Sequence, residues 1–299
     1  MPQNQLAFVT PADAPRWRRL LVLSPVARII IFVLLFVLLS SAFGLLAQGI
    51  GWNLKALSPA NRMWSELVFR AGLPLLAYLA LVKLVERRAV TELAPRQLIP
   101  GGLVGVLAGG ALFSAVVGVL WLLGSYRVIG TNPGADWLSA LLVVGLGAGI
   151  GEEIVCRGVL FRIVEEGLGT WWALLISALF FGVAHIANPG ATLWAAAAIA
   201  IEAGLLFGLL YHLTRSLPIC MGLHAAWNFA QGTIYGIPVS GTKADGWLVS
   251  TRSGPDWLTG GIFGAEASVV ALGVCLLCTL GLLVVARRRG SIVPPAWRR

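Results

Sequence analysis

Long apolar runs separated by short polar stretches dominate the chain. Eight such runs occur, at about residues 27–50, 64–85, 99–124, 136–164, 171–188, 191–213, 217–235 and 262–286. Most of them approach the ~20 residues that an α-helix needs to cross the hydrocarbon core of a bilayer. None shows the alternating pattern of about ten residues that marks a strand of a membrane β-barrel. The pattern therefore predicts an all-α fold, a polytopic membrane helical bundle of about eight transmembrane helices.

The polar stretches divide this single helical domain into five parts. They are a cytoplasmic N-terminal segment at 1–26, helices one to three at 27–134, a core of helices four to seven at 135–235, an external loop at 236–261, and helix eight with a basic cytoplasmic tail at 262–299. The first apolar run is too long for the core of a signal peptide, and no small-x-small cleavage site closes it. We therefore expect it to be an anchored membrane span.

Composition and charge agree with a membrane protein. Only 12% of the residues are charged, whereas soluble proteins carry about 25%. The net charge of +9 would suggest a nucleic-acid partner in a soluble chain. With the N-terminus inside, however, sixteen of the 22 Lys and Arg residues fall on the cytoplasmic side and six, including Lys55, fall outside. By the positive-inside rule, we expect both termini in the cytoplasm of a bacterium, a multi-pass protein of its plasma membrane, the lipid bilayer as a partner, and no nucleic acid.

The fourth apolar run contains a cluster of charged residues. The stretch 151–158 places Glu152, Glu153 and Arg157 among apolar residues, although each charge at the centre of a membrane helix costs roughly 2.5–3.5 kcal/mol on insertion scales. Glu153 and Arg157 are four residues apart on one helix face, so we expect them to pair and to hold this helix in orientation. Glu152 lies about 100° around the helix and has no partner there, which makes it the candidate reactive group.

Two histidines and an asparagine lie in neighbouring apolar runs. His185 belongs to the fifth run and His224 to the seventh, and an intramembrane histidine normally faces the bundle interior or a wet cavity. Asn228 follows His224 by one helical turn and shares its face. Phe181 precedes His185 by one turn and is expected to form a packing wall. Simple hydrogen bonding between helices is the alternative interpretation of the polar groups.

A carboxylate, two imidazoles and a carboxamide suit the activation of water. A glutamate base can take a proton from a water molecule that attacks a carbonyl, and an amide can donate a hydrogen bond to the developing oxyanion. The histidines His185 and His224 would either bind Zn²⁺, which lowers the pKa of bound water, or act without metal as hydrogen-bond donors or acid catalysts. The absence of GxSxG and HExxH motifs argues against a serine hydrolase or a soluble zinc protease.

Three spaced motifs carry a family resemblance. Glu152-Glu153-x-x-x-Arg157, Phe181-x-x-x-His185 and His224-x-x-x-Asn228, in this order over about residues 135–235, resemble the CAAX prenyl protease type II and bacteriocin-processing family of intramembrane proteases. The resemblance implies a membrane bundle with a buried, water-accessible site and Glu152 as general base. It implies that His185, His224 and Asn228 complete the site, either as metal ligands or as groups that hold water and oxyanion, with Glu153 and Arg157 in support.

The same resemblance implies an endopeptidase that acts on a peptide or protein at the membrane. Eukaryotic members of the family cleave prenylated C-terminal tripeptides, and bacterial members are linked to peptide processing or self-immunity. Two other functions stay open at this point. One is a non-catalytic membrane partner or scaffold of the same fold. The other is a proton-coupled transporter, for which Glu202 in the sixth run is a further membrane acid, although the chain shows no matching halves.

Straight helices leave one difficulty. They place Glu152 near the middle of the fourth span and His185 near the outer end of the fifth, so that the depths of the two side chains differ. A tilt, a kink at residues 145–151 or a shifted start of the fifth span would reconcile them.

Overall fold

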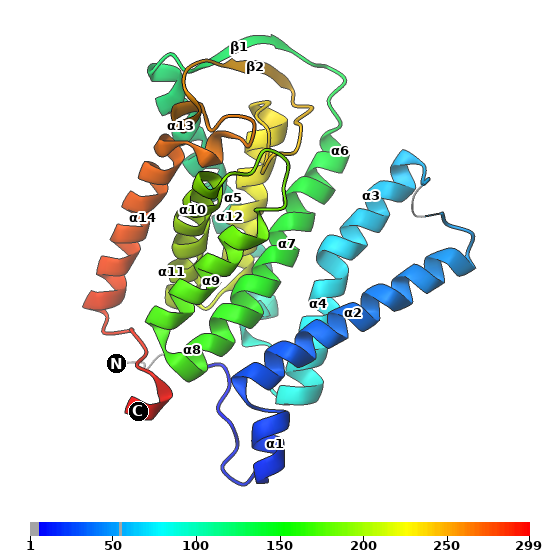
Figure 1. Ribbon diagram of the computed structural model, residues 1–299, viewed down its shortest axis with the longest axis vertical. Coiled ribbons are helices and arrows are strands. Elements are labelled where there is room, and N and C mark those ends of the chain that lie inside the picture. Colours follow the sequence, from blue (N-terminus) through cyan, green and yellow to red (C-terminus); the bar gives the residue numbers. More distant parts are fainter. Residues whose placement is uncertain (1–5, 54–55) are drawn as a thin grey trace.

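The structure, a computed structural model, describes residues 6–53 and 56–299. This part of the chain forms a bundle of long helices with a two-stranded sheet across one end (Figure 1), which confirms the all-α prediction. The first five residues of the predicted N-terminal segment, and Lys55 of the charge count, lie outside the described residues.

The first three membrane helices start at prolines. The short helix α1 (Arg16–Leu21) precedes the first of them, α2 (Pro25–Gly49). The second is a continuous helix made of α3 (Pro59–Leu67), η1 (Val68–Gly72), α4 (Leu73–Ala80) and η2 (Leu81–Glu86). The third, α5 (Pro95–Leu122), follows the turn η3 (Thr91–Leu93). Proline suits the first turn because its missing N–H would have no partner there. The hydroxyls of Ser24 and Ser58 cap α2 and α3.

Four further helical segments form the core that carries the polar cluster. They are the continuous helix of α6 (Trp137–Ser139), η4 (Ala140–Gly147), α7 (Ala148–Glu153), η5 (Ile154–Phe161) and α8 (Arg162–Leu168); helix α9 (Thr170–Ala184); the helix of α10 (Leu193–Ile199), η6 (Ala200–Leu205) and α11 (Leu206–Thr214); and the helix of α12 (Leu217–Phe229) and η7 (Ala230–Ile234). The η4, η5, η6 and η7 stretches are π-helical turns, which are often found at functional sites.

The remaining elements close one end of the bundle and return to the other. Strand β1 (Tyr126–Thr131) pairs antiparallel with β2 (Leu248–Arg252), and α13 (Asp256–Thr259) and η8 (Ala265–Ala267) lead into helix α14 (Val269–Arg288) and the turn η9 (Ala296–Arg298). Figure 1 shows the sheet at the top and α1, α8 and the C-terminus at the bottom. We call these the sheet end and the basic end.

Six helices in the described residues are long and apolar enough to cross a membrane: Pro25–Gly49, Pro59–Glu86, Pro95–Leu122, Trp137–Leu168, Leu193–Thr214 and Val269–Arg288. Two of the eight predicted spans do not meet these criteria. Helix α9 has only 15 residues, and Leu217–Ile234 contains the polar side chains of His224, Asn228 and Gln231. All eight predicted runs are nevertheless helical, with bounds that shift by up to seven residues at the start of α14.

A tight turn resolves the difference in depth between Glu152 and His185. The fourth helix continues to Leu168 and the fifth starts at Thr170, so the predicted bounds of 164 and 171 were wrong by a few residues. Gly169 connects the helices with a φ of 84°, a conformation that glycine adopts at no steric cost. Glu152 lies sixteen residues before Leu168 and His185 sixteen residues after Gly169. The antiparallel arms therefore bring both side chains to the same level.

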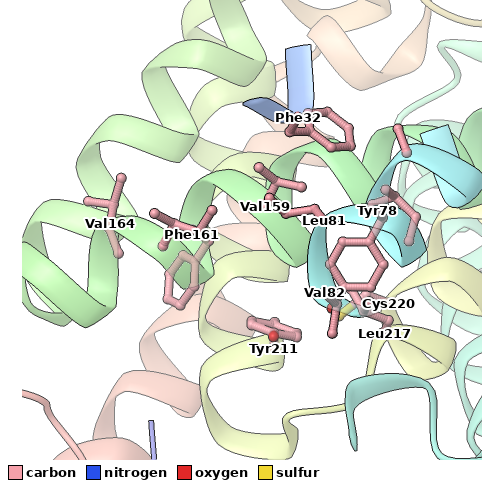
Figure 2. Packing of buried hydrophobic residues seen from close by; sticks show 14 of the residues in the cluster. Phe32, Tyr78, Leu81, Val82, Val159, Phe161, Val164, Tyr211, Leu217 and Cys220 are labelled. Atoms are coloured by element: carbon pink, nitrogen blue, oxygen red, sulfur yellow. The ribbon is translucent and has the colours of Figure 1, made fainter. Parts of the chain in front are cut away.

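An apolar core fills the bundle between the polar cluster and the basic end. Figure 2 shows aromatic and aliphatic side chains from several helices packed together, among them Tyr78, Phe161, Tyr211 and Leu217. These four side chains are almost completely buried. Protein interiors of this kind are packed as densely as organic crystals, so this layer separates the polar groups above it from the basic end.

Buried ion pairs join four elements at the basic end. The guanidinium of Arg28 lies 2.8 Å from Glu86 and 2.7 Å from Glu166, and Arg162 contacts the same two carboxylates at 3.0 and 3.1 Å. The network also includes Arg88 and Glu92. Burial raises the pKa of Glu92. The hydrogen bonds and the positive charge of Arg88 lower it by a larger amount, so the pKa of Glu92 lies below its ordinary value.

Helices α5 and α12 approach each other through glycines. A Cβ atom at Gly109 of α5 would overlap the backbone carbonyl of Leu223 in α12, whereas a Cβ at the neighbouring Gly110 would meet nothing within 4 Å. Small residues allow membrane helices to pack with their backbones in contact. Because Leu223 precedes His224, this contact also sets the position of one predicted site residue.

We expect Arg162→Met to lower the free energy of unfolding by about 3–5 kcal/mol, because it leaves the three buried carboxylates of Glu86, Glu92 and Glu166 with only Arg28 and Arg88 to balance their charge. The matched control is Arg70→Met, since Arg70 pairs with Glu66 at 3.8 Å and both side chains are about half exposed. Such a pair contributes about 0–1 kcal/mol. Unfolding of both variants in detergent measures the difference, and equal losses would show that the network does not stabilise the bundle.

We expect Gly109→Ala to lower the free energy of unfolding by about 1–3 kcal/mol, because the added methyl group forces two helix backbones apart. Gly110→Ala should be neutral or stabilising by up to about 1 kcal/mol, since alanine favours a helix and has open space there. Thermal unfolding of the two variants side by side provides the measurement. A stable Gly109→Ala protein would contradict the close contact.

Candidate active site

The three residues predicted to share a site lie together. Glu152 is near the end of α7, His185 follows the last residue of α9, and His224 lies within α12. The Oε2 atom of Glu152 is 3.8 Å from Nε2 of His185 and 3.9 Å from Nε2 of His224. Both separations exceed the length of a direct hydrogen bond and suit a bridging water molecule. The Oε2 atom itself is buried and has no hydrogen-bond partner among the described side chains.

Hydrogen bonds on the far side of each ring orient the two histidines. Nδ1 of His185 lies 2.7 Å from the backbone carbonyl of Phe181, and a carbonyl can only accept, so Nδ1 carries the proton. This carbonyl is available because α9 ends and the N–H of His185 donates to Gly182 instead. Nδ1 of His224 lies 2.9 Å from Oε1 of Glu153. Both rings therefore turn Nε2 towards Glu152.

The predicted pair of Glu153 and Arg157 forms and supports the site. Nη1 of Arg157 donates to Oε1 of Glu153 at 2.9 Å, and both side chains are fully buried. Nη2 donates to the carbonyl of Ala203 at 2.7 Å in the π-helical turn η6. The guanidinium carbon lies 5.1 Å from the ring centres of Phe181 and Phe207, which adds cation–π attraction. Arg157 thus links three helices, and Glu153 passes this positioning on to His224.

Phe181 and Asn228 complete the predicted set. The Phe181 ring lies 4.7 Å from that of His185 and 6.1 Å from that of His224, as expected of a packing wall. Asn228 is one turn beyond His224, and its Nδ2 donates to the carbonyl of Val144 at 3.3 Å. An amide nitrogen has two hydrogens, so this contact leaves one for another acceptor.

An open cleft adjoins these groups. A cavity of about 630 Å³ contains Glu152, His185 and Asn228 on one side and Phe36 and Phe69 on the other. The side chain of Glu152 is 36% exposed, in contrast to the fully buried Glu153. A second cavity of about 450 Å³ shares Val143, Val144 and Lys243 with the first. We call the two together the open cleft.

A second acidic group behind the histidines was not predicted as part of the site. A small cavity of about 30 Å³ is lined by His185, His224, Glu202, Ser240 and Glu266, and a space of this size accommodates about two water molecules. The backbone N–H and hydroxyl of Ser240 donate to Glu266 at 2.6 and 2.8 Å. Burial raises the pKa of Glu266, although Ser240 and the nearby His185 oppose the shift.

The sequence contained only a weak signal for this group. Glu202 and Glu266 stand out as acids in the predicted sixth and eighth apolar runs, whereas Ser240 lies in the predicted external loop at 236–261. Their proximity depends on how that irregular segment folds back over the bundle. The third histidine, His212, is elsewhere: it is buried near the basic end, with Nδ1 at 2.6 Å from Glu165 and Nε2 at 3.0 Å from Ser291.

The described residues contain no group of three or more His, Cys, Asp or Glu side chains arranged to hold a metal ion. A catalytic zinc site presents three protein ligands at about 2.0–2.2 Å from the ion. Glu152, His185 and His224 do not form such a set. Zinc binding by the two histidines therefore stays a prediction from the sequence.

Comparison with known families agrees with the three motifs. Residues 134–230 match a family described as Rce1-like, type II CAAX prenyl endopeptidase Rce1-like. No match was found among the curated proteins. The matched segment is about one third of the chain, nearly coincides with the predicted core at 135–235, and holds every motif residue from Glu152 to Asn228. Residues 134–230 are thus similar to the Rce1-like type II CAAX prenyl endopeptidases, which supports the resemblance carried by the three motifs, and the six long apolar helices indicate an integral membrane protein.

Proposed function

We propose that the protein hydrolyses a peptide bond of a membrane-associated peptide or protein with a water molecule activated by Glu152. The observation that carries this proposal is the position of one carboxylate oxygen opposite two ring nitrogens, at 3.8 and 3.9 Å, within a cavity that reaches the outside of the bundle. A transporter or a scaffold would not need three polar groups converging on one such point.

The hydrogen-bond pattern assigns the proton transfers. A water molecule between Glu152 and His185 donates one hydrogen to Oε2 and the other to the unprotonated Nε2, and its lone pair is then free to attack a carbonyl carbon. Glu152 takes one proton as the new C–O bond forms, which produces a tetrahedral intermediate with a negative oxygen. Glu152 then returns the proton to the leaving nitrogen as the C–N bond breaks. The products are a carboxylic acid and an amine.

His224 and Asn228 are the proposed donors to the negative oxygen. Nδ1 of His224 donates to Glu153 and its Nε2 points into the site, so the ring donates to the oxygen through Nε2 in its doubly protonated form. Nδ2 of Asn228 keeps one hydrogen beyond its contact with Val144. Donors that are fixed before the reaction stabilise charge that develops in the transition state. Because the three-ligand set of a zinc site is not formed among the described residues, this mechanism routes no step through a metal ion.

We also propose that the basic end faces the cytoplasm of a bacterial cell, with both termini on that side. The polar surface of this end carries nine of the 22 basic residues: Arg16, Arg18, Arg19, Lys83, Arg87, Arg96, Arg287, Arg288 and Arg289. The sheet end carries few basic residues, among them Arg62, Arg127 and Lys243. Cytoplasmic loops of membrane proteins contain an excess of Lys and Arg.

Glu152→Gln should reduce cleavage by about 10²–10⁴-fold, because the amide cannot take a proton from water. The measurement compares the termini of membrane peptides from cells that express the wild-type protein or the variant, which identifies the cleaved bond and the loss of cleavage together. Full cleavage by Glu152→Gln would refute the assignment of the base.

Glu153→Gln should lower the free energy of unfolding by about 3–5 kcal/mol, because it removes the charge that balances the buried guanidinium of Arg157. The adjacent Glu152→Gln serves as the matched control and should change this free energy by no more than about 0.5 kcal/mol, since its Oε2 makes no direct hydrogen bond to the described residues. Unfolding in detergent separates the two roles. Equal destabilisation by both substitutions would show that the division between reactive and supporting carboxylates is wrong.

A further inference from the structure

The small cavity behind the histidines contains two acids that the proposed mechanism does not use. Glu202 lies in the π-helical turn η6 and Glu266 in the turn η8, and both line the cavity together with His185 and His224. We call Glu202 and Glu266 the cavity acids. They are only 3% and 4% exposed. Glu266 accepts two hydrogen bonds from Ser240, whereas the buried Oε2 atom of Glu202 has no hydrogen-bond partner among the described residues.

The charges around the reactive point balance without the cavity acids. Arg157 pairs with Glu153, and the doubly protonated His224 of the proposed mechanism balances Glu152. Neither cavity acid forms an ion pair with a basic side chain in the part of the chain that the structure describes. A buried carboxylate is unfavourable without a counter-charge or a proton. The cavity therefore favours an occupant that is positively charged.

The cavity combines these acids with apolar walls and adjoins the reactive point. Phe207 and Trp227 belong to its lining, and such surfaces can bury the methylene groups of a long side chain whose charged end reaches an acid. The lining shares His185 and Asn228 with the open cleft, so the two spaces meet at the side chains around the proposed water molecule. A polypeptide in the cleft with its scissile carbonyl at Glu152 can therefore direct an adjacent side chain into the cavity.

The size of the cavity discriminates between the two common cationic side chains. Its volume of about 30 Å³ accommodates about two water molecules, which is the space of an ammonium group and one neighbouring methylene. The lysine ammonium is a compact charge, whereas the guanidinium of arginine is a larger planar group. Lysine therefore fits this space, and arginine exceeds it.

We propose that the small cavity is a specificity pocket for the ammonium group of a substrate lysine next to the scissile bond, and that Glu202 and Glu266 recognise this group. The proposal rests on the proposed protease function and names its substrate class, a membrane-associated polypeptide with a lysine beside the cleaved bond. The ammonium supplies the counter-charge that the cavity acids lack, and its three hydrogens find acceptors in their carboxyl oxygens.

The sequences around the cleaved bonds test the substrate class. Bonds that are cut by the wild-type protein and not by Glu152→Gln should carry lysine on one and the same side, about ten-fold more often than lysine occurs in the detected membrane peptides. In a substrate identified in this way, replacing that lysine by methionine or by arginine should lower kcat/KM by about ten-fold or more. Glu152-dependent bonds without a preference for lysine would overturn the proposal while supporting the protease.

Removal of the cavity acids tests the assignment of the pocket. Glu202→Gln and Glu266→Gln, singly and together, keep the volume of the carboxyl groups and remove their charge. The ratio of kcat/KM between the lysine and methionine substrates should fall from about ten or more to about one in the double variant. The matched control Glu66→Gln removes a partly exposed acid on the second membrane helix and should leave this ratio unchanged. An unchanged ratio in all three cavity variants, or an equal fall in the control, would contradict the pocket.

Binding of a small amine separates the pocket from the protease activity. In the Glu152→Gln protein, n-butylammonium chloride should raise the midpoint of thermal unfolding by about 2–4 °C relative to the same concentration of n-propylguanidinium chloride, and adding Glu202→Gln should abolish this difference. If wild type and Glu152→Gln show the same cleaved bonds, the protease function fails, and this shift still decides whether the cavity takes an ammonium group. Equal midpoints in the two salts would overturn the proposal.

Discussion

The buried pair of Glu153 and Arg157 is the interaction on which the arrangement of the site depends. A guanidinium in an apolar bundle is tolerated only with a charge partner and acceptors for its remaining protons. Glu153, the carbonyl of Ala203 and two aromatic faces meet these needs in the structure. The same oxygen of Glu153 orients His224. A stabilising requirement and the geometry of a reactive centre are thus satisfied by one set of contacts, and Glu152, one residue earlier, is left free to face the cavity.

The bundle divides into two halves with different tasks. Towards the basic end, helices meet through buried ion pairs and close apolar packing, as around Arg162 and Tyr78. Towards the sheet end, the first two membrane helices diverge from the other helices, and a cleft opens beside Glu152. Rigid packing on one side is what allows the other side to remain open without loss of alignment among the three helices that supply the polar groups.

Local spacing made part of this site predictable. The pairing of Glu153 with Arg157 follows from a separation of one helical turn, and the long apolar runs account for every helix of the bundle. The level of His185 did not follow, because the polar and glycine residues at 165–170 indicate a loop, whereas the fourth helix continues through Glu165 and Glu166 to Leu168. Contacts between residues that are far apart in the sequence could not be predicted from local spacing either. Arg28 meets a carboxylate 138 residues away, and Glu266 reaches the site through an irregular segment that periodicity does not describe.

The turn at Gly169 has a consequence for how the length of this hairpin can vary. Glu152 lies seventeen residues before Gly169 and His185 lies sixteen residues after it. One added or removed residue in either arm shifts a side chain by about 1.5 Å along its helix and about 100° around it. Such a rotation would turn the carboxylate away from both imidazoles. Related chains that keep this chemistry should therefore differ in the hairpin by substitution, whereas an insertion or deletion would need an opposite change within the same arm to restore both the level and the direction of the side chain.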